Sequence, residues 1–316
     1  MLNSEIIIQV CYLIAAIVFI LGLKRMSSPT TARLGIVWAG GGMLLATAAT
    51  FFTPGMANIE LIIIAIAIGG GLAWMTAKKV AMTDMPQMIA LYNGMGGGAA
   101  AAIAAVEMFK VHELEISVEI LAIIGGIIGA ISFSGSIIAF GKLQGIIKGS
   151  FRFKGQNLLN LLIMLLLILI SITTLMDFEL MKNPVVAVFI IALVFGIAMT
   201  LPIGGADMPV VISLYNALTG LAVGFEGYVL QNYAMIIAGT VVGAAGTLLT
   251  QLMAKAMNRS LGNVLFSGFG DQSISVEGDS ENQGEMKPIE SSDASIMMAF
   301  AQKVIIIPGY GMAVAQ

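Results

Sequence analysis

Long apolar stretches separated by short polar segments follow one another from the first residues to about position 256. Each stretch has about 20 predominantly apolar residues, which is the length a helix needs to cross the hydrocarbon core of a bilayer. The pattern predicts nine transmembrane helices, at residues 3–23, 34–52, 57–77, 85–108, 117–141, 157–175, 184–201, 207–226 and 231–256. We therefore expect an all-α polytopic membrane protein.

Composition supports the membrane assignment independently of the span positions. Of the 316 residues, 58% are hydrophobic and 10% are charged. Soluble domains carry roughly a quarter of charged residues, so this chain lacks the polar side chains that would cover a water-exposed surface. The first span has Glu5 before its apolar core and Lys24 and Arg25 after it, which is the wrong charge order for a cleaved signal peptide. A single cysteine, Cys11, excludes an internal disulfide framework.

Lysine and arginine are unevenly divided between the segments that connect the spans. Eleven lie in one set of alternate segments, whereas only Lys110 and Lys182 lie in the other set. Positively charged residues are retained on the cytoplasmic side of a membrane. We therefore predict an external N-terminus and a cytoplasmic C-terminus for a bundle formed by residues 1–258.

The composition changes after the last predicted span. Residues 271–293 include seven acidic residues and one basic residue, with few large apolar side chains between them. Such a stretch cannot bury enough surface to fold by itself, so residues 259–302 are predicted to be a flexible cytoplasmic linker. We expect a short helix at residues 293–302. The alternative is that the acidic residues bind a specific partner.

The last residues resemble the start of a dinucleotide-binding unit. An apolar run at residues 304–307 is followed by Gly309 and Gly311, the pattern of a strand that turns into a helix whose N-terminus faces a pyrophosphate. Residues 303–316 are thus predicted to be the first strand and turn of a truncated Rossmann-like domain. Only residues 312–316 follow the second glycine, too few for a stable helix, so we expect at most an incomplete cofactor site.

An internal repeat lies within the spans. Residues 84–94 read D-M-P-Q-M-I-A-L-Y-N-G and residues 207–217 read D-M-P-V-V-I-S-L-Y-N-A, so seven of eleven positions are identical at an offset of 123. The copies begin the fourth and eighth spans and both run outward from the cytoplasm, which makes the repeat parallel. An aspartate before a proline-containing first turn is a good helix cap, and this is the structural interpretation of Asp84.

Each copy of the repeat carries an asparagine, Asn93 or Asn216, seven residues after its proline. At 1.5 Å per residue this places the amide roughly 10 Å deeper, close to the middle of the bilayer. Such amides either bond to a neighbouring helix or line a hydrated passage, and both interpretations stay open. Charged side chains in the spans lie at or near the ends, as Glu107 and Glu226 do. We therefore expect a proton route to depend on water or on a titratable group from another subunit.

Four motifs together resemble the beta subunit of proton-translocating NAD(P) transhydrogenase. They are the repeated D-M-P-x-x-I-x-L-Y-N, the G-G-A-D-M-P of residues 204–209, the K-A-M-N-R-S of residues 255–260 and the P-G-Y-G-M-A-V-A-Q of residues 308–316. The resemblance covers the whole chain. It implies a membrane domain that conducts protons while hydride passes from NADH, held by an alpha component, to NADP.

The resemblance also assigns residues. The NADP-binding turn of the family falls on Gly309, Tyr310, Gly311 and Val314. Asp207 and Asn216 match positions of the proton path and its coupling, and Asn93 stands where many relatives carry a histidine. The implied cofactors are NADP, at a site incomplete in this chain, and NAD, bound by the partner alpha component.

The implied assembly is a homodimeric complex with alpha components, including a membrane alpha subunit, in the bacterial cytoplasmic membrane and its lipid bilayer. We expect neither a metal site nor a nucleic-acid partner, and we expect this chain alone to be inactive. The alternative function is a secondary transporter with parallel repeats and a nucleotide-binding regulatory tail, which would need a polar substrate pocket in the middle of the membrane. A structural scaffold is a third alternative, but it gives no reason for the repeated D-M-P motif.

Overall fold

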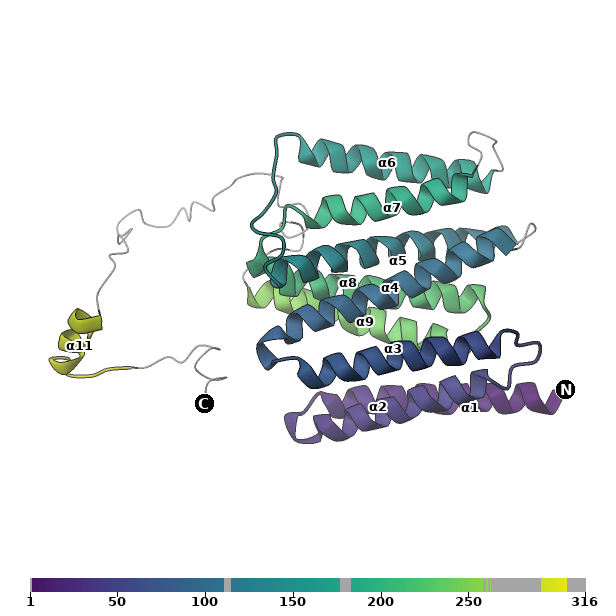
Figure 1. Cartoon of the computed structure of the whole chain (residues 1–316), viewed down its shortest axis with the longest axis horizontal. Coiled ribbons are helices and arrows are strands. Elements are labelled where there is room, and N and C mark those ends of the chain that lie inside the picture. The colour runs from purple at the N-terminus through teal and green to yellow at the C-terminus, as the bar shows by residue number, and fades with distance from the viewer. Residues whose placement is uncertain are drawn as a thin grey trace. The chain divides into compact units, whose positions relative to one another are not determined.

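A computed structural model describes residues 2–110, 115–176, 183–257, 260, 262 and 291–305. The chain forms two compact units, Met1–Gly270 and Asp271–Gln316, each of which is described by itself. The described ranges of the first unit contain nine α-helices and two 3-10 helices (Figure 1). These are α1 (Leu2–Met26), α2 (Pro29–Thr50), α3 (Ile59–Lys79), η1 (Met82–Asp84), α4 (Met85–Lys110), α5 (Ile116–Leu143), α6 (Gln156–Leu175), α7 (Pro184–Thr200), η2 (Gly205–Asp207), α8 (Met208–Val229) and α9 (Tyr233–Ala256).

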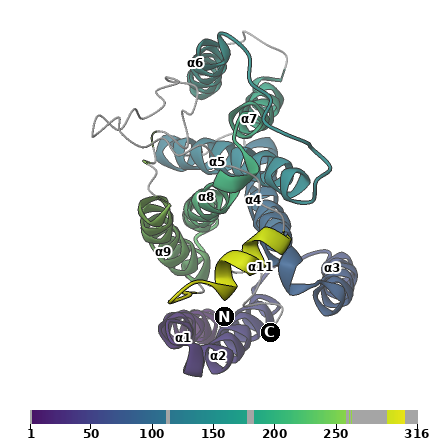
Figure 2. The same cartoon turned by 90° about the vertical axis from the view of Figure 1, so that its left-hand side faces the viewer.

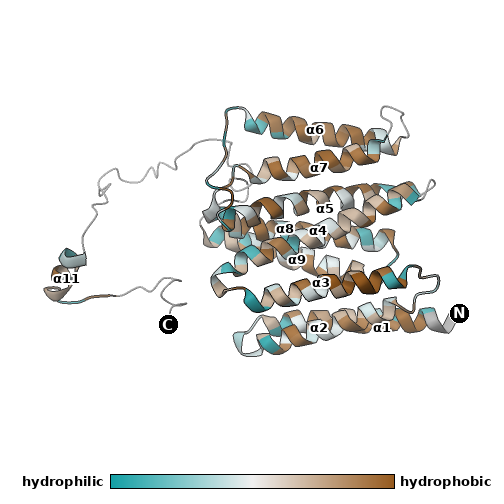
Figure 3. Ribbon diagram, in the orientation of Figure 1, coloured by the Kyte–Doolittle hydropathy of each residue, from teal (hydrophilic) through white to brown (hydrophobic). Residues whose placement is uncertain are grey.

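Every predicted span coincides with one of these helices, although α2 begins at Pro29 instead of residue 34. Within the described residues, eight helices are long and apolar enough to cross a membrane. The ninth, α7, has 17 residues and is entirely apolar except for its terminal threonine, so the predicted number of nine spans is not confirmed. Apolar residues extend along the helices and hydrophilic residues lie mainly near their ends (Figure 3). The chain is a multi-pass membrane protein.

The helix α5 lies among the helices that carry the repeat (Figure 2). It packs against α4, α7 and α8, and α8 packs in turn against α9. The pair α1 and α2 joins the others mainly through α1 and α9, while α6 packs on α7. The two repeat helices α4 and α8 therefore meet on one side of α5.

Glycine allows α8 and α9 to approach closely. A Cβ atom added to Gly239 of α9 would lie 2.3 Å from the backbone nitrogen of Gly224 and 2.6 Å from the carbonyl oxygen of Gly220. No side chain fits at such distances. Small residues spaced by four, as Gly220 and Gly224 are, commonly form contacts of this kind between membrane helices.

The two copies of the repeat have the same local structure. In each copy a 3-10 helix ends at the aspartate and an α-helix begins at the following methionine. The residues before the 3-10 helices, Ala81 and Gly204, have φ and ψ of −73° and 153°, and −72° and 156°. Asp207 is the N-cap residue of α8, but its side chain makes no capping hydrogen bond, so a side-chain cap of the kind inferred from the repeat does not form at this copy.

The structural equivalence extends to the helices that precede the repeat. The hydroxyl of Tyr92 on α4 lies 2.8 Å from Thr76 Oγ1 at the end of α3, and the hydroxyl of Tyr215 on α8 lies 2.5 Å from Thr200 Oγ1 at the end of α7. Each repeat is therefore a unit of two helices joined by a 3-10 helix: α3, η1 and α4 in the first copy, and α7, η2 and α8 in the second.

The described part of the second unit contains one helix, α11 (Ser291–Ala299). The predicted helix at residues 293–302 thus begins and ends earlier than expected. Val304 and Ile305 belong to no strand, so the predicted strand is not confirmed, and an isolated segment has no neighbour with which to form a sheet. The predicted NADP turn (Gly309, Tyr310, Gly311 and Val314) and most of the predicted linker lie outside the described residues.

Candidate functional site

Asn93 lies in the buried interior of the first repeat helix. Its side chain is 8% exposed, and its Nδ2 donates hydrogen bonds to Ser136 Oγ at 3.0 Å and to Ser132 Oγ at 3.5 Å. Ser132 and Ser136 are four residues apart on α5, so both face α4 from adjacent turns of one helix. The amide at the predicted mid-membrane depth is therefore bonded to a neighbouring helix.

Ser132 extends this contact to the second repeat helix. Its hydroxyl donates to the carbonyl oxygen of Tyr215 at 2.9 Å, and Thr219 Oγ1 lies 2.6 Å from Ser132 Oγ. Asn93, Ser132, Ser136 and Thr219 form what we call the polar network. It connects α4, α5 and α8 by buried hydrogen bonds.

One acceptor in the polar network has no partner. Asn93 Oδ1 is buried and makes no hydrogen bond within the described part of the chain. Buried polar atoms are rarely left unpaired, because each such atom loses its bonds to water. This oxygen can accept a hydrogen bond from a further donor, whereas the amide group itself does not titrate.

The other two predicted site residues lie outside the polar network. Asn216 is half-buried on α8 beside Tyr215, and its side-chain amide makes no hydrogen bond to the described residues. Asp207 is half-buried at the start of α8, nine residues or about 13 Å before Asn216 along the helix. The structure therefore joins Asn93 to α8 but brings neither Asp207 nor the amide of Asn216 into the same hydrogen-bonded group.

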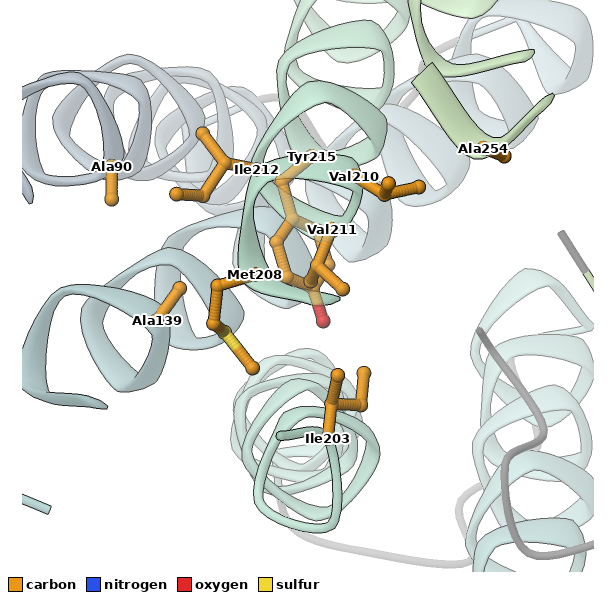
Figure 4. Packing of buried hydrophobic residues seen from close by; sticks show 9 residues of the cluster. All are labelled: Ala90, Ala139, Ile203, Met208, Val210, Val211, Ile212, Tyr215 and Ala254. Atoms are coloured by element: carbon orange, nitrogen blue, oxygen red, sulfur yellow. The ribbon is translucent and has the colours of Figure 1, made fainter. Parts of the chain in front are cut away.

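An apolar cluster lies on the Asp207 side of the polar network. Its nine buried residues gather around the first turns of α8 (Figure 4). They are Ala90, Ala139, Ile203, Met208, Val210, Val211, Ile212, Tyr215 and Ala254. The ring of Tyr215 packs so closely on α5 that a Cβ added to Gly135 would lie 2.3 Å from its Cζ. Within this cluster the polar side-chain atom is the hydroxyl of Tyr215, which lies 2.5 Å from Thr200 Oγ1.

Lys142 is a buried polar residue that the sequence patterns did not single out. It lies at the end of α5, 8% exposed, and its Nζ donates to the carbonyl oxygens of Leu201 and, at 2.6 Å, Ile203. Arg152 Nε donates to the carbonyl of Pro202, between these two residues, at 3.1 Å. Both cations therefore satisfy carbonyls that follow the C-terminus of α7, where the helix dipole favours positive charge.

Glu226 lies in the last turn of α8, near a span end as expected, but its side chain does not reach the surface. The helix α8 continues to Val229, and the Glu226 side chain is 0% exposed. The serines and threonine of the polar network were also missed. The sequence does contain a signal for them, because Ser132 and Ser136 are spaced by four within an apolar span and so lie on one helix face.

Comparison with known proteins gives consistent results. Residues 8–316 match the family model for the NAD(P) transhydrogenase beta subunit. Two curated proteins named NAD(P) transhydrogenase subunit beta, from Rhodospirillum rubrum and from a strain of that species, are each 38% identical over 319 residues. The aligned region covers 96% of this chain and 68% of each relative.

Proposed function

Because the chain belongs to the NAD(P) transhydrogenase beta subunit family, we propose that its polar network forms the middle of a proton path across the membrane. The observation that carries this proposal is the buried Asn93, whose Nδ2 bonds to α5 while its Oδ1 has no partner. Hydroxyl and amide groups can pass a proton along hydrogen bonds. Placing them in a membrane interior costs free energy unless they hydrogen-bond to a neighbouring helix or line a hydrated passage.

In this proposal, proton movement along the path is coupled to hydride transfer between NADH and NADP. The NADP turn is assigned to Gly309, Tyr310, Gly311 and Val314, and NAD is bound by the alpha component. The chain by itself therefore transfers no hydride. The complex is a homodimer in the bacterial cytoplasmic membrane, with a membrane alpha subunit beside this chain.

Coupling requires two states that differ in their contacts. The apolar cluster lies along the first turns of α8, and the carbonyls held by Lys142 precede η2, which ends at Asp207. We propose that this region changes its packing when the cofactor domain changes state. In that case a proton can pass between the polar network and the Asp207 end of α8 in only one of the two states. The surroundings of Asp207 then differ between the two states.

The test is the substitution Asn216→Leu in the assembled complex, reconstituted in liposomes. Asn216 makes no side-chain hydrogen bond to the described residues, so we expect normal stability in detergent. It follows Tyr215, whose carbonyl oxygen accepts from Ser132, so loss of this amide beside the polar network should slow proton-coupled hydride transfer. Asn160→Leu is the matched control, since Asn160 is also half-buried but lies on α6, away from the polar network. Lower stability with unchanged turnover would show that Asn216 serves packing alone.

A further inference from the structure

The seam between α5 and α8 carries a second polar position. Ser132 on α5 pairs with Thr219 on α8 in the polar network. Seven residues before Ser132 is Gly125, and seven residues after Thr219 is Glu226. Seven residues are two helical turns, or about 10 Å, so each of these residues shares a helix face with its network neighbour. Because α5 and α8 run in opposite directions, Gly125 and Glu226 should also face each other.

The contact between Gly125 and Glu226 is present in the structure. A Cβ added to Gly125 would lie 2.2 Å from Glu226 Oε1 and 3.1 Å from the Cβ of Phe225. Because Gly125 has no side chain, the carboxyl group of Glu226 occupies the space next to it. Glu226 therefore points into the same seam as the polar network, on the side towards Val229, which the charge distribution predicts to be external.

The Glu226 carboxyl is buried without a partner. Its side chain is 0% exposed, and neither Oε1 nor Oε2 makes a hydrogen bond within the described residues. Glu107 on α4 is the charged group that acts on it electrostatically, and Glu119 lies in the first turn of α5. The charged residue of α9 is Lys255, in the last turn of that helix. An ionised carboxylate is costly in such surroundings, so a carboxyl held in this geometry is suited to hold and release a proton.

We propose that Glu226 is the proton-holding residue of the outer half of the path. This inference rests on the proposed function and adds the titratable group that the asparagine, serine and threonine side chains cannot supply. In the step, the protonated carboxyl releases its proton towards the polar network and becomes a carboxylate, which then takes a proton from the outer side. The gap of about 10 Å exceeds a hydrogen bond, so water carries the proton between Glu226 and Thr219.

The sequence alone suggested that a partner subunit provides this group. Glu226 makes that contribution unnecessary for the outer half of the path. The two explanations differ in a measurable way, because only one of them makes proton transfer depend on a side chain of this subunit.

The experiment compares three variants of the assembled complex in liposomes that contain a pH-sensitive dye. Glu226→Gln keeps the shape of the side chain but cannot release a proton, so we expect proton movement to slow by about 100-fold, the range of a lost acid–base group. Glu226→Asp retains a carboxyl and should recover much of this rate with an altered pH profile. Glu60→Gln is the control, because Glu60 is an exposed carboxyl in the first turn of α3, away from α5 and α8, and this variant should stay close to wild type.

A second pair of variants moves the carboxyl without removing it. Gly125→Ala forces the Glu226 carboxyl out of its position and should also slow proton movement, whereas Gly224→Ala on α8, whose added Cβ would make only ordinary contacts from 3.7 Å, should not. Wild-type proton movement in Glu226→Gln would overturn the inference and point to a partner's group. If that variant is active but Asn216→Leu is slow, the proposed path stands and only the role of Glu226 is wrong.

Discussion

At the scale of single residues, buried hydroxyl groups of this bundle have two different roles. Ser134, Ser171 and Thr174 donate to carbonyls of their own helix, at 3.1, 2.7 and 2.7 Å. Such bonds satisfy a polar group without joining helices. Ser132 instead connects α5 to both repeat helices. Residue type alone does not distinguish these roles, because both kinds of hydroxyl lie in apolar spans.

The first prediction compares two serines of α5. Ser132→Ala removes the bonds from α5 to Tyr215 and Thr219 and should lower the free energy of unfolding in detergent by about 1 kcal/mol, as for a lost interhelical hydrogen bond. Ser134→Ala loses only bonds within α5 and should change stability by a few tenths of a kcal/mol. Thermal unfolding of the purified subunit complex measures both. Equal losses would mean that Ser132 does not hold α4, α5 and α8 together.

The sequence placed Asn93 inside a span, but it did not reveal the hydrogen-bond partners of its side chain. Depth along a helix follows from residue number, so the sequence is sufficient to place this amide along its span. The packing of α4 on α5 decides which face of α5 meets Asn93. The serines that bond to Asn93 lie 39 and 43 residues further along the sequence. The same limitation hid Glu226, because position near a span end does not say whether a side chain points to water or into a seam.

At the scale of helices, the sequence repeat determines the local backbone geometry of its two copies but not how deeply their side chains are buried. Both copies place a 3-10 helix before the repeat helix and bond a tyrosine to a threonine of the preceding helix. However, Tyr92 is 42% exposed and Tyr215 is 1% exposed, because α8 lies between α5 and α9 whereas α4 has its outer face uncovered. The two copies therefore differ in their surroundings, and α8 carries most of the apolar cluster and Glu226.

The second prediction concerns the contact between α8 and α9. Gly239→Ala inserts a methyl group where the backbone of Gly224 is 2.3 Å away, so the helices must separate. Overpacking of this kind costs about 1–3 kcal/mol, which should appear as a lower unfolding temperature in detergent. Gly69→Ala on α3 is the control, since its added Cβ meets nothing within 4 Å and alanine is favoured in a helix interior. A Gly239→Ala variant as stable as wild type would contradict the close contact.

At the scale of the whole molecule, helix positions were the most predictable feature. Nine apolar stretches became nine helices within the described residues, because each stretch must satisfy its backbone hydrogen bonds internally in a membrane. The helix ends moved by a few residues where polar side chains remain helical, as at Lys78 and Lys79 in the last turn of α3. The NADP turn rests on sequence similarity, since it lies outside the described residues.

The third prediction is the orientation of the bundle. The unequal distribution of lysine and arginine predicts an external N-terminus. In a background without Cys11, an impermeant thiol reagent added to sealed cells should label a cysteine at position 117 or 182 and should not label one at position 280. Labelling at position 280 from outside would reverse the assignment.

The central claim, that the polar network lies on a proton path, is tested most directly by the ratio of protons moved to hydrides transferred. The complex is reconstituted in liposomes with an internal pH-sensitive dye, and NADP reduction by NADH is followed at the same time. Asn93→Leu removes the donor to Ser132 and Ser136 and should slow proton movement and, because the two are coupled, hydride transfer. Tyr92→Phe, which alters the neighbouring but exposed residue, should retain the wild-type ratio and rate. A wild-type ratio and rate in Asn93→Leu would contradict the account.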